Sequence, residues 1–408
     1  MTYEFSEDTA RTWAEVDLGR VGRNAQAIQS YLAGDAFAMA IVKADAYGHG
    51  ADRVARECLR AGVGHFGVAS VAEAREVREA GVHPGSGDIY LLSPFLPDEA
   101  AAIVQADLIP MVSSPEQMEA LLRVAHRAHR PARCFLKLDT GMGRSGGLAS
   151  EIRSLWDTVA AGPDRNLRIT GIATHFSSAD ELTPAGEAAT QTQIDAFREF
   201  VQGIENLPGA TGGGIWLSLS NSPGALRFPR IGLPSQGIRG VLVRTGLLLY
   251  GIEPYPDAFS AEGLPEIEPV LSWKARVTLI RDLPSGATVG YGRTYTLTRP
   301  SRIATVAAGY ADGLPRRLSG IGSVLLQGRA YPLTGRVSMD QCQIDITDAP
   351  VPVGLGDTVT IIGTDGGERQ TVLSVAEAID TIPHEPTCAI SKRVPRHYVR
   401  TATAITSA

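Results

Sequence analysis

Short apolar runs alternate with longer amphipathic segments over the first 250 residues. Segments such as 51–62, 71–81 and 114–128 repeat apolar residues with the period of an α-helix. Ser70, with Glu73 three residues later, predicts the capped start of one of these helices. The apolar runs between the helices span residues 37–43, 65–70, 88–93, 108–113, 133–139, 169–176, 215–222 and 239–246. This alternation predicts a parallel sheet covered by helices on both faces.

Eight strands in this arrangement favour a closed (β/α)8 TIM barrel, an α/β fold. An open doubly wound sheet is the alternative, but no G-x-G-x-x-G motif follows the first strand, as a dinucleotide-binding sheet would show.

Polar residues support the barrel because they gather at or just past the carboxyl ends of the apolar runs. They are Lys43, Ser70, Ser93, Ser113, Asp139, His175, Ser220 and Arg244. In a closed barrel these ends form one ring, where barrel enzymes carry their chemistry. Serines also cap helices, but capping does not explain Lys43, His175 or Arg244.

The pattern changes after residue 255. Residues 255–269 are rich in Pro, Gly and Glu and indicate a linker. Strands with alternating polar and β-branched residues then follow at 270–280, 302–310, 323–333, 342–347, 357–363 and 397–405. Only residues 374–380 have a helical pattern in this part of the chain. We therefore expect a barrel domain over residues 1–255 and a mostly antiparallel β domain over residues 256–408. A further strand at 12–18 is grouped with the barrel domain, although it fits either domain.

Composition narrows the classes of function. The chain has 408 residues, of which 44% are hydrophobic and 20% charged, and its net charge is -6, which is typical of a globular protein. Without clustered basic residues, nucleic acid is not an expected partner. We find no signal peptide and no apolar run long enough to span a membrane, so we expect a cytoplasmic protein. The four cysteines lie far apart, which indicates reduced thiols, and no residue set has the spacing of a metal site.

Lys43 ends the first apolar run, in the segment VKADAYGHG. A lysine in water has a pKa of about 10.4 and is a poor nucleophile at neutral pH. Desolvation at the mouth of a barrel disfavours the charged form, which lets a lysine form an imine or act as a base. The alternative is a lysine that extends from the strand end into solvent. Tyr47, one helical turn further on, and the glycines around His49, which leave room for an anion, favour the chemical role.

An imine with an aldehyde cofactor requires an anchor for a phosphate and a partner for a ring nitrogen. Asn221 and Ser222 stand at an expected helix start, where free N–H groups and hydroxyls bind phosphate. Gly246 and Leu247 offer further amides, and Arg244 just before them can reach a ring nitrogen. Each residue alone is explained more simply by a structural cap or a surface charge. Together, on successive barrel strands, they indicate pyridoxal 5'-phosphate.

VKADAYGHG closely resembles the cofactor-lysine signature of alanine racemases. Other segments similar to that family follow in its order and spacing over nearly the whole chain: WAEVDL, KLDTGMGRSG, THFSSAD, NSPGALRFP, VRTGLLLYGIEP, VGYGRTYT, GYADGLPR, GRVSMDQ and RVPR. The resemblance implies an eight-stranded α/β barrel followed by a β domain, in agreement with the pattern above. It also implies a homodimer that binds pyridoxal 5'-phosphate and interconverts L- and D-alanine, supplying D-alanine for bacterial cell walls.

The resemblance assigns roles to individual residues. It implies that Lys43 holds the cofactor as an imine and is the base on one face of the substrate, with Tyr291 as the base on the other face. The residues implied to hold the cofactor are Tyr47, Ser222, Gly246 and Leu247 at the phosphate, Arg244 at the pyridine nitrogen and His175 near the ring. The residues implied to contact or admit the substrate are Arg144, Met339, Asp340 and Tyr310, the last from the partner subunit. Lys137 matches a lysine that is carbamylated in some relatives, although an unmodified lysine next to an arginine fits equally well.

The chemistry of racemisation agrees with these roles. The α-proton of an amino acid is hard to remove unless the negative charge left behind is delocalised, which this cofactor achieves. Inversion then requires a proton donor on the opposite face, so a lysine and a tyrosine on two faces form a two-base mechanism. An arginine at the ring nitrogen does not give up its proton, which discourages side reactions.

The chain departs from the family at two positions. Ala173 stands where many relatives have an aromatic residue, and Lys392 stands where some have a tyrosine. Both positions lie near the cofactor or the entrance in the family, so a racemase of serine or of a broader amino acid set stays an alternative. An aldolase or decarboxylase of the same fold would leave Tyr291 unexplained. A non-catalytic protein that stores the cofactor would not need the second domain.

Overall fold

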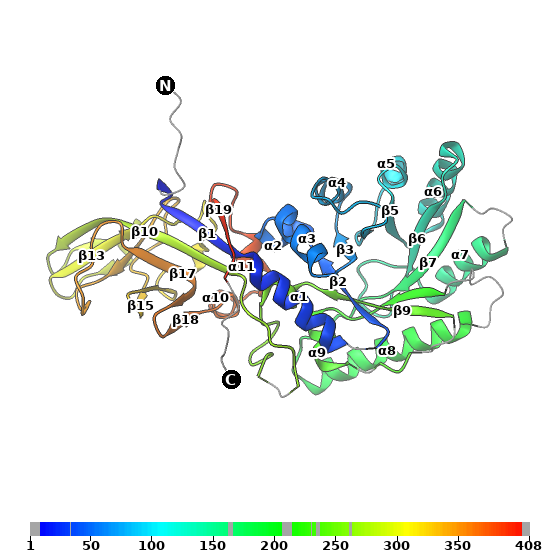
Figure 1. Cartoon of the computed structure of the whole chain (residues 1–408). Coiled ribbons are helices and arrows are strands. Elements are labelled where there is room, and N and C mark those ends of the chain that lie inside the picture. The colour runs from blue at the N-terminus through cyan, green and yellow to red at the C-terminus, as the bar shows by residue number, and fades with distance from the viewer. Residues whose placement is uncertain are drawn as a thin grey trace, which may run out of the picture.

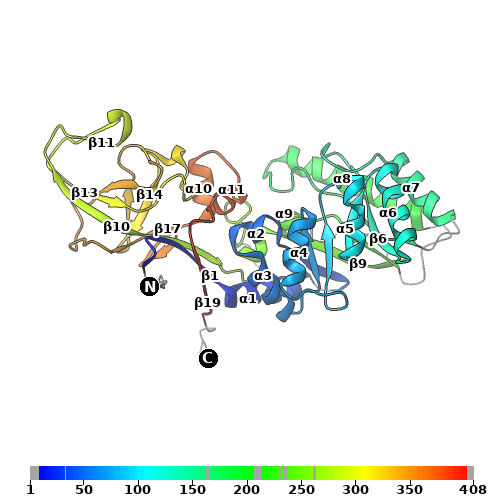
Figure 2. The same ribbon diagram turned by 90° about the horizontal axis from the view of Figure 1, so that it is seen from above.

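The computed structural model describes residues 9–32, 34–161, 166–205, 214–229, 231–233, 237–260 and 263–401. These residues form two bodies that lie side by side, a barrel ringed by helices and a body built mainly of strands (Figure 1). The same two bodies are separate when the molecule is seen from above (Figure 2).

The barrel prediction is confirmed. Within the described residues, eight parallel strands close in chain order: β2 (Ala36–Ile41), β3 (His65–Val68), β4 (Asp88–Leu91), β5 (Leu108–Val112), β6 (Ala132–Lys137), β7 (Leu167–Ala173), β8 (Ile215–Ser218) and β9 (Ile238–Thr245). The first and last of these strands pair, with Ala38 opposite Val243, and this pairing excludes the open sheet. Met39, Phe66 and Phe135 are fully buried, as expected for a barrel filled by its own side chains.

Helices surround the barrel (Figure 1). They are α1 (Leu18–Leu32), α3 (Ala51–Arg60), α4 (Val71–Glu79), α5 (Ala100–Gln105), α6 (Pro115–Ala128), α7 (Ala149–Ala161), α8 (Pro184–Glu205) and α9 (Ser222–Arg227). The predicted cap of α4 is confirmed, because the Ser70 side chain accepts from the Glu73 amide while the Glu73 carboxylate accepts from the Ser70 amide. Among the described residues no helix is both long and apolar enough to cross a membrane.

The second body contains a sheet that has nine strands within the described part of the chain. These strands are β1 (Thr12–Asp17), β10 (Leu271–Leu283), β13 (Ser301–Val306), β14 (Ser323–Leu326), β15 (Arg329–Pro332), β16 (Cys342–Asp345), β17 (Thr358–Asp365), β18 (Glu368–Gln370) and β19 (Arg396–Val399). A two-stranded ribbon, β11 (Thr288–Val289) with β12 (Tyr295–Thr296), completes it. Its pairings are antiparallel except between β1 and β19, so the mostly antiparallel β domain is confirmed.

Two details of the second body differ from the sequence prediction. We grouped the strand at 12–18 with the barrel domain, but β1 pairs with β10 and β19 instead. The barrel closes on itself and has no free edge for another strand, whereas the sheet has one. We also expected one helix here; α10 (Val372–Ala378) confirms it, but α11 (His384–Cys388) was missed. Its five residues are too few to show a helical period. The boundary at 255/256 stays a prediction.

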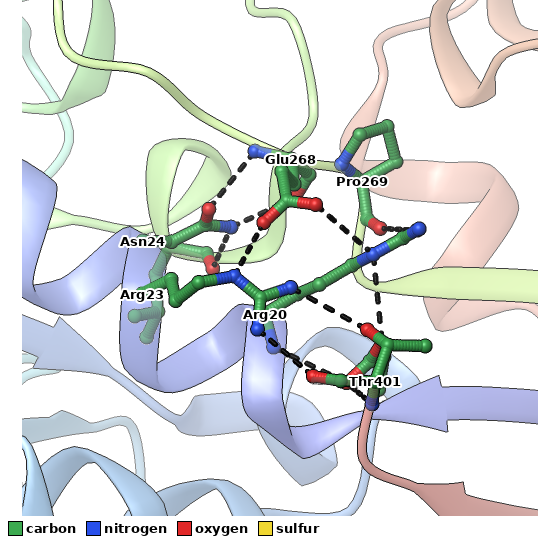
Figure 3. Close-up of polar contacts among 8 residues, drawn as sticks. Arg20, Arg23, Asn24, Glu268, Pro269 and Thr401 are labelled. Carbon is green, nitrogen blue, oxygen red and sulfur yellow. Dashed lines mark hydrogen bonds and ion pairs between the residues drawn. The ribbon is translucent and has the colours of Figure 1, made fainter. Parts of the chain in front are cut away.

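A polar cluster around the buried Asn24 joins the two bodies where α1 meets the linker (Figure 3). The fully buried Asn24 donates to the carbonyls of Leu249 at 3.1 Å and Glu268 at 2.8 Å, and it accepts from the Glu268 amide at 2.9 Å. Arg23 donates to the Glu268 carboxylate at 2.6 Å and to the Thr401 carbonyl at 3.1 Å. The linker is thereby fixed to the barrel, and the second body is fixed with it.

Candidate active site

A cavity of about 630 Å³ opens at the carboxyl ends of the barrel strands. The second body closes one side of it through α11, which packs against α2 (Lys43–Gly48) (Figures 1 and 2). The residues of the sequence prediction that line this cavity are Lys43, Tyr47, Lys137, Arg144, His175, Asn221, Ser222, Arg244, Gly246 and Leu247. The structure therefore brings together every residue that we predicted to hold a cofactor.

Lys43 lies two residues after the end of β2 and is half-buried. Burial, followed by the positive charge of Arg144, lowers the pKa of its amine, and the carboxylate of Glu73 opposes this shift. A lowered pKa increases the fraction of uncharged amine, which is the form that reacts with a carbonyl or accepts a proton.

The backbone after Lys43 makes a left-handed turn. Residues 44–47 have φ between 51° and 55° and ψ between 38° and 50°, although none of them is a glycine. Such a conformation costs an L-residue roughly 1–2 kcal/mol, so it persists only where the surroundings enforce it. Glu73 contributes by accepting from the Ala44 amide at 2.8 Å. We predicted an ordinary helical turn here; the turn is left-handed instead, and Lys43 and Tyr47 at its two ends both line the cavity.

Arg244 and His175 form one hydrogen-bonded unit on the cavity wall. Nη2 of Arg244 lies 2.7 Å from Nδ1 of His175 and also donates to the Leu219 carbonyl at 2.6 Å, while Nη1 donates to the Ser218 hydroxyl at 2.6 Å. An arginine only donates, so Nδ1 of His175 is the acceptor. Burial and Arg144 lower the pKa of Arg244 to about 9, which leaves the guanidinium charged at neutral pH. Burial and Arg244 also lower the pKa of His175 well below its usual range.

Small groups and amides line the opposite end of the cavity. A β-carbon added to Gly246 would lie 2.6 Å from the hydroxyl oxygen of Tyr47, so only glycine leaves this space open. The Ser222 hydroxyl accepts from the Leu248 amide at 3.3 Å. The Asn221 side chain accepts from the Gly224 amide at 3.0 Å and caps α9, which is the structural role left open above.

Four residues assigned to the reaction or the substrate do not line this cavity. Tyr291, Tyr310 and Met339 lie in the second body, with exposed fractions of 70%, 44% and 52%. The carboxylate of Asp340 pairs with Arg393 at 2.7 Å. The ribbon strand β11, just before Tyr291, lies at the end of the second body that points away from the barrel (Figure 2). One chain therefore does not bring these residues to Lys43.

Comparison with known proteins identifies the family. Residues 16–254 match the family described as alanine racemase, N-terminal domain, and residues 270–398 match alanine racemase, C-terminal domain. The chain belongs to the alanine racemase family. The alanine racemase of Halothermothrix orenii is 38% identical over 400 residues, which cover 96% of this chain and 97% of that protein.

Solved structures of this family share the fold. The alanine racemase of a D-cycloserine-producing Streptomyces lavendulae has a TM-score of 0.85 at 32% identity and covers 98% of this chain and 99% of its own. The alanine racemase of Bartonella henselae with covalently bound pyridoxal phosphate has a TM-score of 0.80 at 29% identity, covering 96% and 100%. The recognition of the family from sequence is confirmed.

Two residues of α11 that line the cavity were not predicted from the sequence. His384 and Cys388 line it from α11, and the ring of His384 lies 5.5 Å from that of Tyr47. Burial and the charge of Lys43 lower the pKa of His384 to about 4, so the imidazole is neutral at neutral pH. Ser218 does not line the cavity, but its hydroxyl accepts from Arg244 and was also missed. Its place at the end of a barrel strand that pairs with the strand of Arg244 was a usable signal.

Ala173 and Lys392 do not line the cavity of this single chain. Ala173 is fully buried in the barrel wall, where its carbonyl accepts from the Leu138 amide at 2.8 Å, and it does not line the cavity. Lys392 is exposed and does not line the cavity either. The effect of Ala173 and Lys392 on the size of the substrate stays a prediction.

Proposed function

We propose that this protein is a pyridoxal-phosphate-dependent racemase that interconverts L-alanine and D-alanine by a two-base mechanism. The observation that carries the proposal is the cavity at the barrel mouth, where a half-buried lysine, a charged arginine and an amide-lined pocket face one another. Membership of the alanine racemase family supports the same reaction. Supply of D-alanine to peptidoglycan and a place in the cytoplasm are parts of this proposal.

The cavity suits pyridoxal 5'-phosphate. Its volume of about 630 Å³ falls within the range of small-molecule sites. Gly246 leaves open a space beside the Tyr47 hydroxyl that a β-carbon would fill, and the Leu247 amide and Ser222 hydroxyl adjoin it. We assign the phosphate to this space, the ring nitrogen to Arg244 and the covalent bond to Lys43. The structure of the related Bartonella henselae alanine racemase contains covalently bound pyridoxal phosphate, which supports the choice of cofactor.

When bound, the cofactor delocalises the negative charge that is left on the α-carbon of the substrate after proton removal. Residues of the chain itself bind the cofactor and orient the substrate. Arg244 donates from a charged guanidinium, so it holds a ring nitrogen without protonating it. His175 accepts from Arg244 and thereby helps to fix the orientation of the guanidinium. Arg144 brings positive charge next to Lys43, where the carboxylate of an amino acid would be attracted.

Two bases on opposite faces of the substrate require a second chain. Lys43 serves one face from the barrel, and we assign the other face to Tyr291. Because Tyr291 is 70% exposed and does not line the cavity of its own chain, we propose a homodimer in which the second body of each subunit completes the site of the other. Tyr310, Met339 and Asp340 reach the substrate in the same way. A two-fold axis makes the two contacts identical and closes the assembly.

The test is purified protein, supplied with pyridoxal 5'-phosphate, incubated with single L-amino acids and followed by chiral chromatography. We expect D-alanine to accumulate until the two enantiomers are equal, because a racemase brings them to an equilibrium constant of one. The Lys43→Ala variant is the control for contaminating host enzyme. Faster racemisation of serine than of alanine would replace alanine by the broader alternative, and loss of the amino acid without racemisation would refute the proposal.

A further inference from the structure

His49 is a fully buried histidine that does not line the cavity. Its Nδ1 lies 2.9 Å from the carbonyl oxygen of Ala46 and 3.0 Å from that of Tyr47. Since a carbonyl oxygen only accepts, Nδ1 must carry a proton and donate to both. Burial lowers the pKa of His49 to about 4, which keeps the ring in the neutral form with its proton on Nδ1.

The two carbonyl groups belong to the left-handed turn that follows Lys43. The Ala46 carbonyl also accepts from the backbone amide of His49 at 3.1 Å, so the loss of the ring donor falls mainly on the Tyr47 carbonyl. A buried carbonyl that loses a donor destabilises the conformation that exposes it, and this turn is strained already. The His49 ring is itself held in place, because it stacks on Tyr250 with centroids 4.4 Å apart and planes 25° apart. The Tyr250 hydroxyl donates to the carbonyl of Ile41, at the end of β2, at 2.6 Å. The donor and the strand that leads to Lys43 are thus parts of one rigid unit.

The glycines on either side of His49 admit the second body. A β-carbon on Gly48 would lie 2.3 Å from the Thr387 carbonyl oxygen, and one on Gly50 would lie 1.9 Å from the Tyr398 hydroxyl. We interpreted these glycines as room for an anion, but the structure fills that room with the second body. The two glycines of the GHG segment therefore allow the second body to pack closely against the end of the turn, and the histidine between them donates to the carbonyls of the turn.

We infer that His49 is a positioning residue, whose Nδ1–H holds the left-handed turn so that the Lys43 amine and the Tyr47 hydroxyl face the same cavity. The roles of Lys43 and Tyr47 in this inference rest on the proposed function. The conformation of the turn does not depend on it. We expect that the turn relaxes when the donor is removed, and that the Tyr47 hydroxyl then leaves the phosphate space beside Gly246.

The experiment compares His49→Asn and His49→Phe. The amide nitrogen of asparagine replaces Nδ1–H at a similar distance from the backbone, whereas phenylalanine keeps a ring on Tyr250 but donates nothing. His65→Phe is the matched control, because His65 is another partly buried histidine with a hydrogen bond, 3.1 Å to the Tyr90 hydroxyl, and a ring contact, to Trp216. It begins β3, so it lies at the end of the barrel opposite the cavity. Three quantities are measured: hydrogen exchange of residues 42–51 without cofactor, the dissociation constant of pyridoxal 5'-phosphate by equilibrium dialysis, and the melting temperature.

For His49→Phe we expect faster exchange in residues 42–51 and cofactor binding weaker by about tenfold or more, the size of an unmade hydrogen bond. His49→Asn should restore both quantities to near the values of the unsubstituted chain. His65→Phe should lower the melting temperature without changing either. A His49→Phe variant that melts earlier but exchanges and binds like the control would overturn the inference.

Two further outcomes keep the test decisive. If His49→Phe does not fold, His49→Gln replaces it, because its amide lies one methylene further out and cannot make both bonds. Binding as tight in His49→Gln as in His49→Asn would then overturn the inference. If the unsubstituted chain binds no pyridoxal 5'-phosphate, the proposed function fails, but the exchange rates still decide whether His49 holds the turn.

Discussion

Gly246 and Tyr47 lie so close together that a β-carbon on the glycine would be 2.6 Å from the tyrosine hydroxyl oxygen and 3.2 Å from the ring carbon that bears it. The first residue follows β9 and the second ends the left-handed turn after β2. These two strands pair to close the barrel, which fixes the backbone positions from which the two residues approach each other. The space between them is therefore bounded by the backbone of Gly246 on one side and by the side-chain hydroxyl of Tyr47 on the other.

Substitution of Gly246 by alanine tests this relationship. We expect Gly246→Ala to weaken binding of pyridoxal 5'-phosphate by about tenfold to a hundredfold, since the new methyl group displaces the Tyr47 hydroxyl and narrows the phosphate space. Gly367→Ala is the matched control, because nothing lies within 4 Å of a β-carbon there. Equilibrium dialysis measures both variants.

A double substitution identifies the atom responsible. In a Tyr47→Phe background the hydroxyl is absent, so adding Gly246→Ala should cost less than it does in the unsubstituted chain. The difference is the coupling between the two residues in a double-mutant cycle. Strictly additive losses would show that the methyl group acts through something other than the Tyr47 hydroxyl.

Acid should destabilise this fold partly through His49. Burial lowers its pKa from 6.5 to about 4 in the folded chain. Between these values the unfolded chain binds a proton that the folded chain does not, so stability is complete above about pH 6.5 and falls as the pH is lowered. The loss approaches about 1.4 kcal/mol per pH unit and ends near the folded pKa, for a total of roughly 3 kcal/mol.

Urea unfolding of the cofactor-free chain between pH 4.5 and 7 measures this dependence. His49→Asn cannot titrate, so its free energy of unfolding should fall less steeply with acid than that of the unsubstituted chain. His384, with a folded pKa also near 4, adds a second contribution that the variant keeps. Equal slopes in the two proteins would contradict a neutral, buried His49.

The barrel and most of the cavity were predictable because their signals are local. A strand buried on both faces must be apolar along its length, and parallel strands bring their carboxyl ends to one rim. Lys43, His175 and Arg244 could therefore be placed on one site without knowledge of the angles between strands. The same reasoning has no access to contacts made by residues far away in the chain.

The left-handed turn and the wall formed by α11 depend on such distant contacts. Residues 44–47 include two alanines, which favour a right-handed helix, so propensity alone points away from the observed turn. Tyr250 packs on the turn, and Thr387 and Tyr398 pack against the glycines that follow it, from two hundred residues or more further along the chain. Our proposal that Tyr291 acts in another subunit could not come from a local residue pattern, because such a pattern carries no information on the symmetry of an assembly.

Loss of the Tyr291 hydroxyl should affect the two enantiomers differently. If Tyr291 serves the face opposite Lys43, Tyr291→Phe should slow α-proton exchange of L-alanine by about a hundredfold or more, while exchange of D-alanine through Lys43 stays measurable. Exchange in deuterium oxide, followed by NMR of the α-position, reports on each enantiomer separately. Equal loss for both enantiomers, with cofactor binding intact, would contradict the assignment of the two bases.

Subunit mixing tests where the two bases meet. Lys43→Ala and Tyr291→Phe chains should each be nearly inactive alone. In a mixed dimer with shared sites, one site carries both defects and the other carries neither. Random re-pairing of equal amounts makes half of the dimers mixed, each with one intact site of two, so activity should recover to about a quarter of that of the unsubstituted enzyme.

A mixture of Lys43→Ala chains with Arg244→Gln chains is the matched control. Both substitutions lie in the barrel cavity, so each site of a mixed dimer carries one of them, and re-pairing should restore no activity. Recovery in the first mixture and not in the second requires that Tyr291 acts across the dimer. If exchange of subunits is demonstrated by mass and the first mixture stays inactive, the bases come from one chain and the exposed position of Tyr291 needs another explanation.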